Sequence, residues 1–153
     1  MNEPLGAATR YEVSGENVPG GAGWIASRTS TIAFDGSRQT GVVLPGPADL
    51  LAAALAACIL KNVERFSVIL SFRYERASVD VAIDREEPPP RIVRARYTLR
   101  IVTDEPSHRV DLLHRNIRQF GTITNTLAVA CDLQGEIVAL QPGAGKPTAG
   151  HNP

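Results

Sequence analysis

The chain has 153 residues, of which 43% are apolar, and this is enough for one domain with a hydrophobic core. Its 16 basic and 16 acidic residues cancel, so the sequence offers no bulk charge for binding nucleic acid or an anionic membrane surface. The two cysteines, Cys58 and Cys131, are too few for a disulfide framework in a chain of this size.

The N-terminal sequence and the length of the longest apolar run indicate the compartment of the protein. The N-terminal sequence lacks the basic segment followed by an apolar stretch that marks a secretory signal. The longest apolar run has eleven residues, well short of the ~20 that span a bilayer. We therefore expect a cytoplasmic protein whose cysteines begin as thiols. The Gly- and Pro-rich composition of residues 142–153 predicts a flexible C-terminal tail after a single domain over residues 1–141.

The first third of the chain is typical of β-structure. Strands are predicted at residues 9–13, 24–34 and 39–44. The tight-turn signal Asp35-Gly36 would join the last two strands into a hairpin. Pro45-Gly46-Pro47 then ends this region.

A hydrophobic helix is predicted to follow, and it contains Cys58. The run from Leu50 to Leu60 is apolar all round, which indicates burial, while the helix becomes amphipathic from Lys61 onward. We expect a buried first half and a half-exposed second half, with Asp49 at the helix start. From the residues alone, Cys58 is either an inert packing group or a nucleophile held in a dry pocket.

The second half of the chain predicts a hairpin, two helices and a last strand. Period-two alternation marks strands at residues 77–84 and 93–101, whose Asp and Arg side chains would pair on the wet face. A helix opens at Pro106-Ser107 and breaks at Gly121, and a short helix at 125–130 precedes a strand at 136–140. This order predicts an α+β fold with helices packed on one face of an antiparallel sheet.

Common catalytic and metal-binding motifs are absent from the sequence, so no metal or cofactor is predicted. His108 and His114 are six residues apart, and a helix does not bring residues with this spacing together as a metal-binding pair. We expect His114 to lie on the polar side of its helix.

The stretch from Pro47 to Cys58 resembles the helix of the OsmC/Ohr family (osmotically inducible / organic hydroperoxide resistance proteins), which places a Pro eleven residues before its peroxide-reactive cysteine. Tyr74 to Val102 resembles that family's hairpin, and Phe120 to Leu127 resembles its second conserved segment. The resemblance covers roughly residues 24–141 and implies an OsmC/Ohr-like fold. In it, an antiparallel sheet packs on a central, hydrophobic, cysteine-bearing helix within an intertwined homodimer.

The resemblance implies that Cys58 is the peroxidatic cysteine of a thiol-dependent peroxidase that reduces organic hydroperoxides. Two family residues are missing. The resolving cysteine is replaced by Gly121, and the Glu that follows the Pro is replaced by Ala48. Asp49 lies on the opposite side of an ideal helix from Cys58, so we interpret it as a helix-start residue. The resemblance then implies a one-cysteine variant that needs an external thiol or dithiol reductant.

The remaining site residues stay open at this point. Cys131 either resolves Cys58 or packs. Arg28 is the preferred activator of a Cys58 thiolate, and Arg38 is the second choice. The alternative function is a non-catalytic protein that binds a small apolar or electrophilic ligand at the dimer interface, and a purely structural Cys58 is a third reading.

Overall fold

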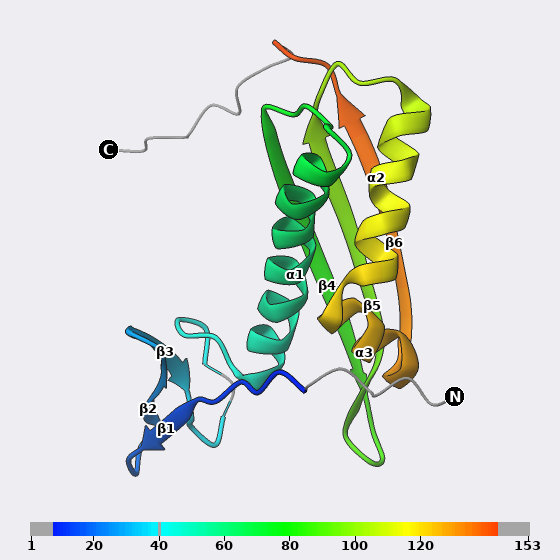
Figure 1. Cartoon of the computed structure of the whole chain (residues 1–153). Coiled ribbons are helices and arrows are strands. Elements are labelled where there is room, and N and C mark those ends of the chain that lie inside the picture. The colour runs from blue at the N-terminus through cyan, green and yellow to red at the C-terminus, as the bar shows by residue number, and fades with distance from the viewer. Residues whose placement is uncertain (1–7, 40, 144–153) are drawn as a thin grey trace, which may run out of the picture. The chain divides into compact units, whose positions relative to one another are not determined.

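The computed structural model describes residues 8–39 and 41–143, which cluster into two compact units (Figure 1). The first unit runs up to Leu50, and the second begins at Leu51. Most of the predicted tail, from residue 144 on, lies outside the described residues.

The first unit contains a three-stranded antiparallel sheet in the order β1-β2-β3. Its strands are β1 (Ser14–Asn17), β2 (Ala22–Ser27) and β3 (Ser30–Asp35). The predicted single strand over 24–34 is therefore wrong. The chain reverses inside it, with Ser27 paired to Ser30 and a positive φ of 55° at Arg28. This turn contains neither Gly nor Asn, so no local sequence signal predicts it.

The predicted strands at 9–13 and 39–44 are also wrong for the residues described there. The carboxylate of Asp35 explains the second difference. It accepts hydrogen bonds from the Ser37 hydroxyl (2.6 Å) and from the N–H groups of Ser37 (2.9 Å) and Gly41 (2.6 Å). These bonds, that of the hydroxyl first, lower the pKa of Asp35. A side chain thus satisfies backbone donors that a strand would have used, and it holds the segment as a loop.

Helix α1 (Pro47–Ile69) follows this loop. Asp49 Oδ2 accepts a hydrogen bond from the N–H of Gly46 at 2.8 Å, which confirms the predicted role of Asp49 at the helix start. At the other end, Ser71 adopts a positive φ of 48°, and the N–H of Phe72 returns to the carbonyl of Ser67 at 2.8 Å. Among the described helices, α1 included, none is both long and apolar enough to cross a membrane.

The second unit is built on a three-stranded sheet with helices on one face (Figure 1). Its strands are β4 (Arg76–Glu86), β5 (Arg91–Val102) and β6 (Asp132–Leu140). The β4–β5 pairing is antiparallel and confirms the predicted hairpin, while β6 runs parallel to β5. The parallel pairing follows because α2 (Ser107–Phe120) and α3 (Thr122–Ala130) form a crossover connection between β5 and β6. The α+β class with antiparallel sheets is confirmed, and the parallel strand adds to it.

Opposite charges line the wet face of the hairpin, as predicted. Arg94 lies opposite Asp84 and forms an ion pair with it at 2.9 Å. Arg100 pairs with Asp80 across the same two strands. Both pairs are largely exposed, so they favour the strand register and add little to the free energy of unfolding.

The core lies between α1, α2 and the inner face of this sheet. Its largest fully buried apolar side chains are Leu55, Ile59, Val63, Leu99, Ile101, Leu113 and Ile117. Within the chain, the predicted burial of the first half of α1 is wrong, because that half is no more buried than the second, whereas the predicted half-exposed second half is confirmed. Asn62, Phe66 and Ser67 in the second half are buried, whereas Leu60 in the apolar first half is 37% exposed. The reason is that the sheet and α2 cover only one side of an all-apolar helix.

A polar cluster holds the end of α1 against the start of α2. The Glu105 side chain is 8% exposed, and its carboxylate accepts from the N–H of Arg73 (2.9 Å) and from Nε of Arg109 (2.6 Å). The Arg73 N–H and then Arg109 lower the pKa of Glu105, against the effect of burial. Nη2 of Arg109 also donates to the carbonyls of Leu70 (2.8 Å) and Ser71 (2.9 Å). Arg109 thus supplies the positive charge that the last turn of α1 lacks.

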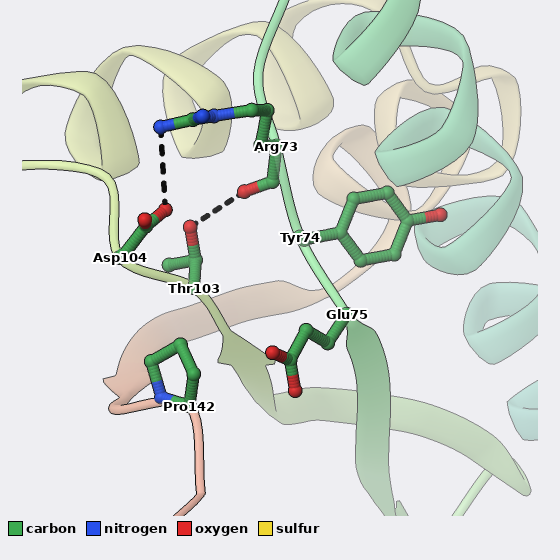
Figure 2. Close-up of a pocket in the computed structure, with 6 residues that line it drawn as sticks. All are labelled: Arg73, Tyr74, Glu75, Thr103, Asp104 and Pro142. Carbon is green, nitrogen blue, oxygen red and sulfur yellow. Dashed lines mark hydrogen bonds and ion pairs between the residues drawn. The ribbon is translucent and has the colours of Figure 1, made fainter.

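Figure 2 shows the surface beside this cluster. The Thr103 hydroxyl donates to the Arg73 carbonyl at 2.6 Å, and the Arg73 side chain reaches Asp104 at 3.6 Å. The Arg73 and Asp104 side chains are 79% and 61% exposed, whereas those of Arg109 and Glu105 are 31% and 8% exposed.

We predict that Arg109→Met lowers the thermal unfolding midpoint by roughly 5–10 °C, because the enclosed Glu105 carboxylate loses its charged partner and keeps only the Arg73 N–H, and the carbonyls of Leu70 and Ser71 lose their side-chain donor. The matched control is Arg73→Gln, which removes only the exposed ion pair and keeps the Arg73 N–H. Differential scanning calorimetry measures both midpoints. Equal shifts for the two variants would contradict the assigned role of Arg109.

Candidate functional site

Cys58 lies in the middle of α1, at the edge of the face that enters the core. Leu55 and Ile59, on either side of it in the sequence, are fully buried. Cys58 itself is half-buried and carries a free thiol. A half-buried position lets a small reagent reach the sulfur while the helix holds the backbone rigidly.

A buried amide contacts this sulfur. Nδ2 of Asn62 lies 3.6 Å from Cys58 Sγ and 2.9 Å from the Cys58 carbonyl oxygen. Asn62 is 7% exposed. Within the described part of the second unit, it is the one side chain that donates a hydrogen bond to Cys58 Sγ. Asn62 is not among the site residues predicted from the sequence, although its spacing of four residues after Cys58 places the two side chains on the same helix face.

Cys131 lies at the end of α3, directly before β6. Its thiol donates to the carbonyl of Leu127 at 3.4 Å. Burial, and then the neighbouring charge of Asp132, raise the pKa of the Cys131 thiol, which keeps it protonated and weakens it as a nucleophile. Its role as a resolving cysteine stays a prediction.

Arg28 and Arg38 belong to the first unit and are both exposed. Arg28 lies at the turn between β2 and β3 and not inside the predicted strand, and Arg38 lies in the loop organised by Asp35. Their action on Cys58 stays a prediction. Ala48, at the exposed start of α1, offers a methyl group where the resembled family has a carboxylate.

Gly121 forms the joint between α2 and α3, and its surroundings leave little room for a side chain. A Cβ at this position would lie 2.7 Å from Thr124 Oγ1 and 3.0 Å from the carbonyl oxygen of Ile117. Among the described residues, Thr124 Oγ1 is buried and has no hydrogen-bond partner. The packing around position 121 is therefore tight and suits glycine.

His114 does not lie on the polar side of its helix, so that prediction is wrong. It is half-buried, and its Nε2 lies 2.8 Å from the hydroxyl of Tyr97 on β5. It falls between Val110 and Ile117 on the buried stripe of α2, which carries it inward. Opposite Tyr97, a Cβ on Gly135 would be 2.0 Å from the ring, so this close approach requires glycine.

The environment of this pair changes its titration. Burial, and then the charge of Arg118, lower the pKa of His114, although Asp111 opposes them. Burial also raises the pKa of Tyr97. The neutral imidazole is therefore the form that the folded protein favours.

Other features of the described residues do not compete with Cys58 as a site. No group of three or more His, Cys, Asp or Glu side chains within the described ranges is placed to hold a metal ion. The hollow in Figure 2 lies at the end of the sheet and contains none of the predicted site residues. Its lining residues are Arg73, Tyr74, Glu75, Thr103, Asp104 and Pro142.

Comparison with known proteins finds one family and several structures. The family model described as OsmC-like protein matches residues 39–134. The OsmC-like protein from Mycoplasma pneumoniae superposes with a TM-score of 0.80 at 14% identity, over 88% of this chain and 99% of that one. The organic hydroperoxide resistance protein OhrB of Bacillus subtilis gives 0.62 at 19% identity, over 86% and 100%.

A further organic hydroperoxide resistance protein, from Legionella pneumophila, gives a TM-score of 0.65 at 13% identity, over 85% of this chain and 98% of that one. No curated protein matches the sequence significantly. At these identities the structures establish the fold, and they confirm the predicted OsmC/Ohr-like α+β architecture.

We predict that His114 makes the protein less stable in acid. Because its pKa is lowered from 6.5 in the folded state, the unfolded chain binds the proton more readily, and stability falls as the pH drops below about 6.5. Replacing it by a neutral residue, His114→Gln, should flatten this loss. Urea unfolding between about pH 5 and pH 8 measures the effect, with His108→Gln at an exposed position as the control. An unchanged pH slope in His114→Gln would refute the assignment.

Proposed function

Because the chain belongs to the OsmC-like protein family, whose model spans residues 39–134, we propose that it is a thiol-dependent peroxidase that reduces organic hydroperoxides through Cys58. The observation that carries the proposal is the half-buried, free Cys58 thiol on an apolar helix, with a buried amide at its sulfur. The names of two similar structures, both organic hydroperoxide resistance proteins, support the substrate class.

The proposed reaction oxidises Cys58 and reduces the peroxide. The Cys58 thiolate attacks the terminal oxygen of the hydroperoxide, the O–O bond breaks, and the alkoxide leaves as an alcohol after taking up a proton. Cys58 becomes a sulfenic acid. Because Gly121 stands where the family has its resolving cysteine, an external thiol condenses with the sulfenic acid, releasing water. A second thiol, or the other arm of a dithiol, then regenerates Cys58 and carries away a disulfide.

We further propose two points. The first is that the two units form one domain over residues 1–141. The second is that Arg28, or Arg38 as the second choice, contributes positive charge near Cys58. The family match supports the first point, because it runs across the boundary between Leu50 and Leu51. The need of a reactive cysteine for a stabilised thiolate supports the second. We propose the cytoplasm as the compartment, because thiol reductants are abundant there.

The working form is proposed to be a homodimer. Apolar side chains stay uncovered on α1 and at the end of α2, with exposed fractions of 37% at Leu60, 72% at Val68, 59% at Ile69 and 47% at Phe120. Large apolar side chains left exposed on a helix favour its burial against a partner. A second copy of this chain would cover the side of α1 that its own sheet leaves open.

We predict that Cys58→Ser abolishes the consumption of cumene hydroperoxide in the presence of a dithiol, because serine is not oxidised to a sulfenic acid. Peroxide loss is followed over time beside the wild type and Cys131→Ser. Turnover that survives in Cys131→Ser supports the one-cysteine cycle, whereas its loss there would assign the resolving role to Cys131.

The same assay separates the alternative function. Equal background loss of peroxide in the wild type and in Cys58→Ser would contradict the peroxidase proposal. The ligand-binding alternative instead predicts saturable thermal stabilisation by a small apolar compound without turnover.

We predict that the double variant Val68→Glu, Ile69→Glu is monomeric, because two carboxylates in an apolar interface must be desolvated without partners. Sedimentation velocity on the wild type should show a dimer. Circular dichroism checks that the variant keeps its fold. A wild type that sediments as a monomer at high concentration would contradict the proposed assembly.

A further inference from the structure

We propose that Asn62 is a positioning residue for Cys58, whose amide fixes the sulfur in one orientation and favours its thiolate form. This inference deepens the proposed function, on which it rests, because it assigns a partner to the same reactive cysteine. It concerns the state of the thiol before any peroxide is present, so it can be tested separately.

The helix places the two side chains together. Residues four apart on an α-helix lie on one face, and Nδ2 of Asn62 is within reach of both the carbonyl oxygen and the sulfur of Cys58. An amide nitrogen carries two N–H groups, so one can serve each acceptor. The 2.9 Å bond to the carbonyl anchors the amide, and the second N–H is then held beside Sγ at a nitrogen–sulfur distance of 3.6 Å.

The contact to the carbonyl does not by itself explain why an amide is buried here. In an α-helix, the carbonyl of residue 58 already accepts from the N–H of residue 62. Asn62 lies among buried apolar neighbours on α1, including Ile59, Val63 and Phe66, where an apolar side chain would avoid the cost of burying an amide. The sulfur is the acceptor that gains from this donor, and it gains most when it is charged, because a hydrogen bond to an ionised group is stronger.

The charged groups of α1 that follow Cys58 do not provide the same contact. Lys61, Glu64 and Arg65 are exposed, and the Arg65 guanidinium lies over the ring of Phe66 at 5.3 Å from its centroid. Across the described residues of the second unit, no ion pair or charged hydrogen bond from another element reaches Cys58. Asn62 is therefore the group in this unit that can respond to the charge on the sulfur.

The chain provides a matched control for this geometry. Asn116 on α2 makes the same contact four residues back, from Nδ2 to the carbonyl of Leu112 at 2.8 Å, and it is likewise partly buried. The side chain at position 112 is apolar, so this amide has no sulfur beside it. Replacing Asn116 tests the loss of a helix side-chain amide without touching the thiol.

The experiment measures the rate of alkylation of Cys58 by iodoacetamide as a function of pH. The full-length protein carries Cys131→Ser, so that Cys58 is the one cysteine that can be alkylated. We compare Asn62→Leu, Asn62→Asp and Asn116→Leu. Asn62→Leu removes the donor, and Asn62→Asp places a carboxylate against the thiolate. Both should move the midpoint of the pH–rate profile upward and slow alkylation at neutral pH by roughly three- to tenfold, with the larger effect in Asn62→Asp.

Asn116→Leu should leave the profile where it is. A profile in either folded Asn62 variant that coincides with that of Asn116→Leu would overturn the inference. Because Asn62→Asp keeps the size of the side chain, it carries the test if Asn62→Leu does not fold. Arg28→Gln, measured in parallel, separates any contribution of that residue from the effect of Asn62.

The outcome is independent of peroxide chemistry. A shifted profile in a protein that consumes no hydroperoxide would support the role of Asn62 and reject the peroxidase. An unshifted profile in a protein that turns over through Cys58 would reject the role of Asn62 alone.

Discussion

The packing of α1 against the β4-β5-β6 sheet sets the position of the other features of the second unit, because the helix is apolar over a wide surface and the sheet covers only one side of it. Leu55, Ile59 and Val63 fill the covered side and are almost completely buried. Cys58 falls at the edge of this stripe and is therefore half-buried. The same incomplete cover leaves apolar side chains such as Val68 exposed, which is the basis for the proposed dimer.

Polar contacts at the two ends of α1 hold its middle in place. At the start of α1, Asp49 accepts a hydrogen bond from the N–H of Gly46. At its end, Arg109 donates to the carbonyl of Leu70 and is paired with the enclosed Glu105. A helix fixed at both ends keeps the Cys58 and Asn62 side chains in a constant relation, which is the condition for one to influence the other. The stability of the fold and the proposed reactivity of the thiol thus depend on the same element.

The joint at Gly121 between α2 and α3 is too tightly packed for a larger residue to fit easily. The close approach of Thr124 and Ile117 leaves no room for a Cβ without movement of these neighbours. At the other cysteine, burial and Asp132 raise the pKa of Cys131. For the proposed peroxidase, both observations favour a reductant that comes from outside the chain.

The sequence by itself determined the elements whose signals are local. Helix α1 with Asp49 in its first turn, the β4–β5 hairpin and the break at Gly121 follow from periodicity, capping and glycine. The spacing from Pro47 to Cys58 indicated the family. Tertiary structure decided whatever depends on which surface meets which partner. The reversal at Arg28, the parallel pairing of β6 and the inward orientation of His114 are of this kind. The role of Asn62 also depends on tertiary structure. Periodicity predicts which face of a helix a residue occupies, but not which element covers that face. The burial of Asn62 is what distinguishes its contact to Cys58 from that of a solvated side chain.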